Sequence, residues 1–69
     1  MHSCINIKVN GKNSTIEDGT VLSEAVELWE IKGPFAITVN SVLVSRAHYA
    51  EHELRDGDIV DVIYPIQGG

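Results

Sequence analysis

The chain has 69 residues, of which 43% are hydrophobic and 22% charged, and its formal net charge is -5. A chain of this length forms one domain, and this composition is that of a globular protein and not of a disordered one. Five basic residues against ten acidic ones argue against a nucleic acid or an anionic membrane as partner, because both attract clustered Lys and Arg.

Cys4 is the only cysteine, which excludes a disulfide within the chain and a thiolate cluster for a metal. We expect Cys4 to pack as a small hydrophobic residue and the protein to work in a reducing cytoplasm. We also expect no secretory signal and no apolar run that spans a membrane. His48 and His52 are four residues apart, but Tyr49 stands where a zinc-protease motif needs Glu, so we expect a solvated turn and no metal site.

The chain opens with the pattern of a β-hairpin. Residues 4–9 alternate between apolar and polar side chains, which predicts a half-buried strand. Asn10-Gly11 follows and is the strongest short hairpin signal, because both residues tolerate a positive φ. Residues 14–17 are predicted to form the return strand, which Asp18-Gly19 closes.

An amphipathic helix is predicted after the hairpin. Thr20 is a good N-cap, since its hydroxyl can accept a hydrogen bond from a free amide of the first turn. Apolar residues then recur at intervals of three and four, namely Val21, Leu22, Ala25, Val26, Leu28 and Trp29. Gly33 and Pro34 are expected to end the helix. Trp29 is expected to pack against the core.

A second hairpin is predicted from the next alternating segment. Residues 35–39 place their larger side chains on one face, Asn40-Ser41 supports a tight turn, and residues 42–44 form a short partner strand. Residues 46–54 are polar with scattered apolar positions, which suggests a helical turn packed over the open end of the sheet.

The last predicted strand covers residues 59–64. Asp61 marks the solvent side of this strand, so Val60 and Val62 are expected to face the core. Pro65 has no amide hydrogen to donate to a sheet and is expected to release the chain from it.

These elements together predict an α+β roll of two layers. One helix joins two hairpins and covers one face of a mixed sheet of four to five strands. The strand after the long connection is expected to pair parallel with the first strand, between the two hairpins. Residues 1–64 are therefore predicted to form the domain and residues 65–69 a flexible C-terminal tail.

The tail ends in Gly68-Gly69. Terminal glycines are often only frayed chain ends. Without Cβ atoms, however, two glycines let the backbone of another protein close around them. We therefore interpret the chain as a protein substrate whose reactive atom is the carboxyl carbon of Gly69. Pro65, Ile66, Gln67 and Gly68 would form the segment that a partner binds, and the last four residues span at most roughly 13–14 Å.

The folded body is expected to supply most of the recognition energy, because ordering each tail residue costs about 1–2 kcal/mol in backbone entropy. Ile59 and Ile63 flank Asp61 on the solvent side of the last strand. Exposed apolar patches mark partner sites, so these two residues are the candidate centre of a docking face. The alternative is that residues 46–54 cover them.

Several short motifs follow one another along nearly the whole chain. They are Asn10-Gly11, Gly19-Thr20-Val21, residues 35–40, Val44-Ser45-Arg46, residues 54–58 and Pro65-Ile66-Gln67-Gly68-Gly69. In this order and spacing they resemble the ThiS/MoaD family of ubiquitin-like sulfur carriers, and most of all its thiamine-pathway branch. The resemblance implies the β-grasp fold. Ser45 and Tyr49 depart from the branch pattern, which usually has proline and often tryptophan at these positions.

The resemblance also implies a function. The chain would be no enzyme and would bind no cofactor, and it lacks a glycine-rich phosphate loop with Lys-Ser/Thr. An E1-like, ThiF-like adenylyltransferase would use ATP to adenylate Gly69. A sulfur donor such as a cysteine desulfurase would convert the adenylate to a thiocarboxylate, and a ThiG-like thiazole synthase would take the sulfur for the thiazole of thiamine. The free carrier is expected to be a monomer.

Two alternatives stay open on the sequence. The first is a MoaD-like small subunit of molybdopterin synthase, whose members favour Phe-Pro before the tail, where this chain has Tyr64-Pro65. The second is a ubiquitin-like modifier or interaction domain, whose tail is joined to lysines or is inert.

Overall fold

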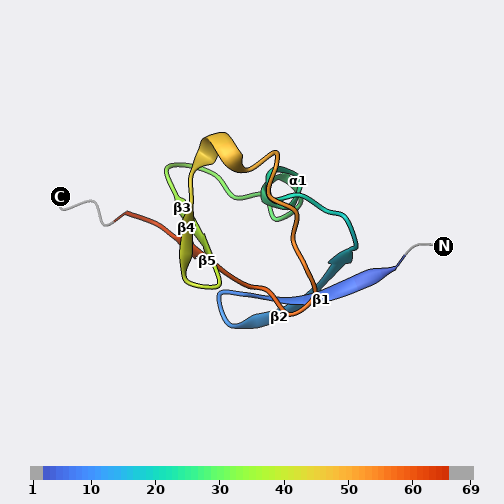
Figure 1. The fold of residues 1–69 in the computed structure, drawn as a ribbon. Helices are drawn as coiled ribbons and strands as arrows, with labels where there is room; N and C mark the ends of the chain where they lie inside the picture. Colours follow the sequence, from blue (N-terminus) through green and yellow to red (C-terminus); the bar gives the residue numbers. More distant parts are fainter. Residues whose placement is uncertain (1–2, 66–69) are drawn as a thin grey trace.

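The computed structural model describes residues 3–65, which form five strands, one α-helix and one short 3-10 helix (Figure 1). In chain order the elements are β1 (Cys4–Val9), β2 (Lys12–Glu17), α1 (Leu22–Leu28), β3 (Ala36–Val39), β4 (Val42–Val44), η1 (Arg46–His48) and β5 (Ile59–Ile63). Within this part of the chain no helix is long and apolar enough to cross a membrane.

The five strands form one mixed sheet in the order β2-β1-β5-β3-β4. Two antiparallel hairpins, β1–β2 and β3–β4, flank the last strand. β5 pairs parallel with β1 and antiparallel with β3. The strand after the long connection thus lies between the two hairpins, and the predicted α+β, β-grasp roll is confirmed.

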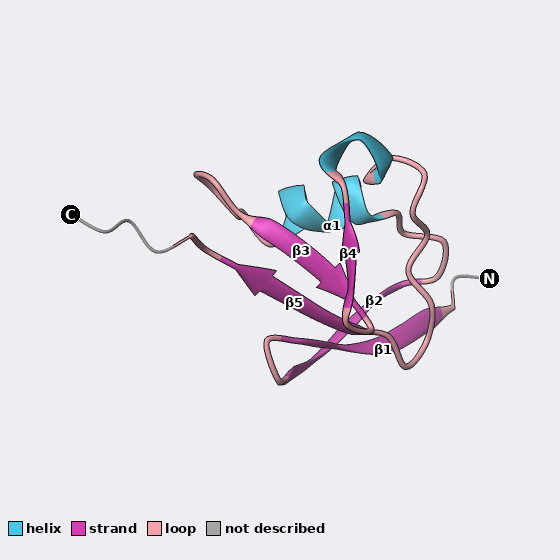
Figure 2. Ribbon diagram, turned by 60° about the vertical axis from the view of Figure 1, so that its left-hand side comes forward, coloured by secondary structure: helices cyan, strands magenta, loops and turns pink. Residues whose placement is uncertain are grey.

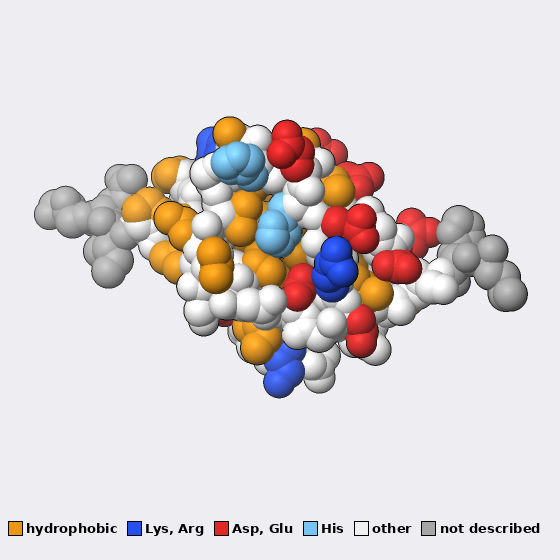
Figure 3. Space-filling view, in the orientation of Figure 1, with side chains coloured by type: hydrophobic (Ala, Val, Ile, Leu, Met, Phe, Trp, Pro, Cys, Tyr) orange, Lys and Arg blue, Asp and Glu red, His pale blue; other side chains and the backbone are white. Residues whose placement is uncertain are grey.

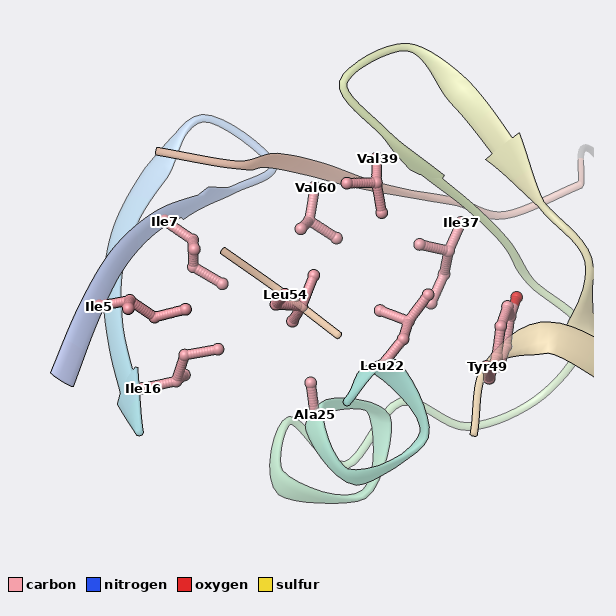
Figure 4. Close-up of a cluster of buried hydrophobic side chains, with 10 residues drawn as sticks. All are labelled: Ile5, Ile7, Ile16, Leu22, Ala25, Ile37, Val39, Tyr49, Leu54 and Val60. Carbon is pink, nitrogen blue, oxygen red and sulfur yellow. The ribbon is translucent and has the colours of Figure 1, made fainter. Parts of the chain in front are cut away.

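The core lies between the sheet and α1 (Figure 4). Alternate residues of the strands point into it, as their apolar-polar pattern predicts. The buried hydrophobic residues are Ile5, Ile7, Ile16, Leu22, Ala25, Ile37, Val39, Tyr49, Leu54 and Val60. Val62 and Trp29 are partly buried against this cluster, as expected. Leu28, which shares the apolar spacing of the helix, is instead 66% exposed at its end.

The start of α1 differs from the sequence prediction. Val21 is the N-cap residue, and the amide of Val21 donates to the Glu24 carboxylate at 3.1 Å. Thr20 is buried and its hydroxyl donates to the Glu17 carbonyl at 2.7 Å. The prediction of Thr20 as N-cap is therefore wrong, because its hydroxyl closes the turn after β2 and does not face the helix.

The end of α1 also comes earlier than Gly33-Pro34. The Ile31 amide donates to the Val26 carbonyl and the Glu30 amide donates to the Glu27 carbonyl, which is the hydrogen-bond pattern of a Schellman motif. Glu30 holds the left-handed position of this motif with φ 53°. Glu30 takes the left-handed conformation that a glycine usually supplies at this position, so the helix ends there. The prediction that Gly33 and Pro34 end the helix is therefore wrong.

The long connection before β5 packs against the helix. The amide of Leu22 donates to the His52 carbonyl at 2.8 Å and the amide of Ser23 donates to the Tyr49 carbonyl at 3.1 Å. The Tyr49 ring stacks on Phe35, with 6.3 Å between ring centroids. The predicted helical turn is η1, and residues 46–54 close one end of the core.

Candidate functional site

The described part of the candidate tail is Pro65, which is exposed and follows β5. Ile66, Gln67, Gly68 and the predicted reactive residue Gly69 lie outside the described residues, as does most of the proposed division between the domain and the tail. The described residues nearest to the candidate tail are those of β5 and Tyr64.

Two prolines end the sheet where the chain leaves β5. The β3–β5 register ends with Ala36 paired to Ile63, and Pro34 and Pro65 lie two residues beyond this last pair. The Asn40 amide donates to the Ile59 carbonyl at 2.7 Å and the Ile59 amide donates to the Asn40 side chain, so Asn40 and Ile59 form a hydrogen-bonded pair at one end of this ladder. Every second pair along the ladder is of the same kind, and the next such pair after Ala36 and Ile63 would need the amides of Pro34 and Pro65. Neither proline has an amide hydrogen, so the ladder cannot extend toward the tail.

Two asparagine side chains fix the position of β5. Both asparagines begin tight turns with a positive φ, 51° for Asn10 and 52° for Asn40. The Asn10 Oδ1 atom accepts the amide of Val62 at 2.8 Å, and the Asn40 Oδ1 atom accepts the amide of Ile59 at 3.0 Å. Each side-chain oxygen replaces the backbone carbonyl that turned away at that residue. β5 is thereby held from both neighbouring hairpins.

Asn40 is held in turn by an aspartate. Its Nδ2 atom donates to Asp58 Oδ1 at 3.0 Å, and the other oxygen of Asp58 accepts the amide of Arg55 at 2.9 Å. The turn before β5 and the turn between β3 and β4 are therefore joined by one hydrogen-bond network.

The candidate docking face is open on the side of the sheet away from α1. Ile59 is 47% exposed and Ile63 is 50% exposed. The segment 46–54 lies beside α1 and does not cover them (Figure 2). Leu43 adds to this face, since Leu43 and Asp61 are both register partners of Thr38 and directly paired residues point to the same side. Leu43 is 67% exposed.

A shallow hollow of about 260 Å³ borders Ile59. Lys8, Asn13 and Asp58 also line it. Lys8 is a register partner of Ile59, so a cation lies beside the apolar docking face. Figure 3 shows the wider arrangement: hydrophobic side chains gather on the side where β3, β4 and β5 lie, and acidic side chains gather on the side of α1 and the N-terminus.

The remaining candidates from the sequence do not form a chemical site. Among residues 3–65, no three His, Cys, Asp or Glu side chains are placed to hold a metal ion. His48 Nδ1 and Ser45 Oγ form an exposed 2.7 Å hydrogen bond within the turn at η1. Cys4 is exposed at the start of β1, so its expected packing role is wrong.

Sequence reasoning missed three residues around β5. The side chains of Asn10 and Asn40 were assigned only to turns, although each has a carbonyl oxygen that a turn leaves free. Leu43 was assigned only to a strand. Leu43 lies between Val42 and Val44 on this strand, and neighbouring residues of a strand point to opposite faces of the sheet. The sequence therefore contained the signal that Leu43 and the two valines lie on different faces.

Two comparisons with known proteins point to the same family. The family model described as "ThiS family" matches residues 5–69. Among solved structures, the chain is similar to the crystal structure of the thiamine biosynthesis protein ThiS from Geobacter metallireducens, with 25% sequence identity and a TM-score of 0.84. That match covers 94% of this chain and 100% of the other. The search of curated proteins found no match.

Proposed function

Because the chain belongs to the ThiS family, we propose that it is a sulfur carrier of thiamine biosynthesis whose working group is the Gly69 carboxylate. The observation that carries this proposal is the extent of the family match, which runs from the first strand through Gly69 and so includes the diglycine end. The similar solved structure is that of a thiamine biosynthesis protein, which favours the thiamine pathway over the molybdopterin alternative.

The chemistry begins with activation of the carboxylate. A carboxylate oxygen of Gly69 attacks the α-phosphate of ATP on a ThiF-like, E1-like adenylyltransferase, and pyrophosphate leaves. The resulting acyl adenylate has AMP as leaving group, whereas the free carboxylate is a poor electrophile. ATP belongs to the partner, and this chain acts as a protein substrate and not as an enzyme.

Sulfur enters in the second stage. The terminal sulfur of a persulfide, formed by a donor such as a cysteine desulfurase, attacks the Gly69 carbonyl carbon and expels AMP. A thiol then takes the inner sulfur into a disulfide and leaves the thiocarboxylate on Gly69. A ThiG-like thiazole synthase uses that sulfur to build the thiazole ring. Because these steps need free thiols, we place the carrier in the cytoplasm.

The folded body supplies recognition in this scheme. Pro65, Ile66, Gln67 and Gly68 carry the carboxylate into the partner, while the exposed face around Ile59 and Ile63 docks on the partner surface. Support for this division comes from burial, since both isoleucines are about half exposed on the strand that leads to Pro65. The free carrier is proposed to be a monomer, which its net charge of -5 favours.

Intact-mass measurement tests the proposal. The full chain is incubated with the ThiF-like enzyme of the same organism, ATP and a cysteine desulfurase with cysteine. We expect one oxygen to be exchanged for sulfur, and we expect the ThiG-like synthase with its substrates to reverse the change. A chain without Gly69 is the control and should stay unmodified. Isopeptide adducts on lysines, or an unchanged mass for the full chain, would contradict the carrier function.

A further inference from the structure

The backbone groups of β5 alternate between its two neighbours. Ile59 exchanges hydrogen bonds with Asn40 on the β3 side, so the amides and carbonyls of Asp61 and Ile63 point the same way. The carbonyl of Val60 accepts the amide of Asn10 at 2.9 Å on the β1 side. The groups of Val62 and Tyr64 therefore point toward β1.

β1 ends before it can pair with all of these groups. The β1–β5 register stops at Val9 with Val60, and the chain turns away at Asn10. The Asn10 side chain takes the amide of Val62. Within residues 3–65, no hydrogen bond is made by the Val62 carbonyl or the Tyr64 amide on this edge. Figure 2 shows β5 running past the turn between β1 and β2.

The free groups form a short strand edge next to the tail. Val62 offers an acceptor and Tyr64 a donor, and Tyr64 is 55% exposed. One residue of an extended chain running parallel to β5 can donate to the first and accept from the second at once. On the β3 side, Asp61 and Ile63 are already paired with Thr38 and Ala36, and neither Pro34 nor Pro65 beyond them has an amide hydrogen to offer.

We propose that this edge, the Val62 carbonyl and the Tyr64 amide, pairs with an extended backbone segment of the adenylating enzyme. The proposal rests on the proposed function, in which that enzyme binds Gly69. Four residues separate Pro65 from the end of Gly69 and span at most roughly 13–14 Å. The enzyme surface that holds Gly69 must therefore lie close to Tyr64, and an extended backbone is what the alternating acceptor and donor match.

A second copy of the chain fits this edge less well. Each copy carries a net charge of -5, so two copies repel each other. The edge also offers only two groups, which is too few for a stable sheet between copies on its own. Two hydrogen bonds are enough for an enzyme that already holds the tail, because the pairing then takes place within one complex and at a high effective concentration.

Amide hydrogen exchange of the full chain tests the pairing directly. We expect the Tyr64 amide to exchange rapidly in the free carrier and to become protected when the ThiF-like enzyme and ATP are added. In a parallel measurement, Tyr64→Pro removes the amide, whereas Tyr64→Ala removes the ring and keeps the amide. Loss of one hydrogen bond should raise KM for the carrier about threefold to tenfold in Tyr64→Pro relative to Tyr64→Ala.

Folding is checked separately, because the Tyr64 amide that Tyr64→Pro removes makes no hydrogen bond within residues 3–65. Equal unfolding midpoints for the two variants are expected. An unprotected Tyr64 amide with equal KM values, while adenylation proceeds normally, overturns the pairing and leaves the proposed function intact. Protection that depends on carrier concentration without enzyme assigns the edge to a second copy and also overturns it. Failure of the unmodified chain to be adenylated refutes the proposed function and the pairing together.

Discussion

Asn10 and Asn40 each serve both the turn after a strand and the position of β5. Both residues take a positive φ, which asparagine tolerates better than most residues. Both also give their side-chain oxygen to β5, at 2.8 Å and 3.0 Å. They differ in one respect, since the Nδ2 atom of Asn40 donates to Asp58. Aspartate at position 10 can keep the acceptor, whereas aspartate at position 40 would face the Asp58 carboxylate.

This difference gives a prediction at the residue scale. Asn10→Gly keeps the turn conformation but removes the acceptor, and should lower the free energy of unfolding by about 1 kcal/mol. Asn10→Asp should be close to wild type. Asn40→Asp should be clearly destabilised by repulsion from Asp58. Denaturant unfolding and exchange of the Val62 amide measure these effects, and faster Val62 exchange in Asn10→Asp than in Asn10→Gly would contradict the assignment.

At the scale of the elements, α1 is a seven-residue helix. Its two ends are not set by the predicted residues, Thr20 at the start and Gly33-Pro34 at the end. Its first amides are satisfied by Glu24 and by the carbonyls of Tyr49 and His52. Its last turn ends in a Schellman motif with Glu30 at the left-handed position. A residue with a Cβ is strained in that conformation by roughly 1–2 kcal/mol.

Replacing Glu30 with glycine should therefore stabilise the protein. The relief of strain exceeds the entropy that glycine adds to the unfolded chain, so we expect a net gain of about 0.5–1 kcal/mol for Glu30→Gly. Glu30→Ala is the matched control, because it removes the same charge and keeps the strain. Thermal and denaturant unfolding compare the two variants. Equal stability of glycine and alanine at this position would show that the charge, not φ, matters.

The molecule as a whole has two sides of different character. Hydrophobic side chains gather near β3, β4 and β5, and acidic ones near α1 (Figure 3). In the proposed complex with the adenylating enzyme, fixing the backbone of each bound residue costs about 1–2 kcal/mol, which contacts elsewhere must offset. The apolar face with Leu43, Ile59 and Ile63 is the part of the described surface best suited to supply that energy, because burial contributes about 25 cal/mol per Å² of apolar area.

A charge placed on this face should separate docking from folding. Ile63→Asp is expected to raise KM for activation about tenfold or more, because a carboxylate would have to be desolvated in the interface. Leu28→Asp is the matched control: Leu28 is also an exposed apolar residue, but it lies at the end of α1. Adenylation kinetics and circular dichroism are measured for both. Unchanged kinetics for Ile63→Asp would remove this face from the docking surface.

Much of the architecture was predictable because the signals are local. The alternation of residues 4–9, the Asn10-Gly11 turn and the polar mark of Asp61 placed β1, the first hairpin and the core side of β5 correctly. Contacts between distant segments could not be predicted in this way. The bond from Asn10 to Val62 joins residues 52 positions apart, and no local pattern encodes it. The position of Ile59 and Ile63 was predicted, whereas Leu43 became part of their face only through its pairing with Thr38.

The prolines at positions 34 and 65, just beyond the last β3–β5 pair, also fix the point where the chain leaves the sheet. Because neither proline has an amide hydrogen, the β3–β5 ladder cannot extend past its last pair, Ala36 and Ile63. Each added residue lengthens an extended spacer by roughly 3.3–3.6 Å. That increment is about the whole separation allowed between two reacting atoms. Under the proposed carrier function, we therefore expect the insertion of one residue after Pro65 to disturb the reaction more than a change of one side chain there.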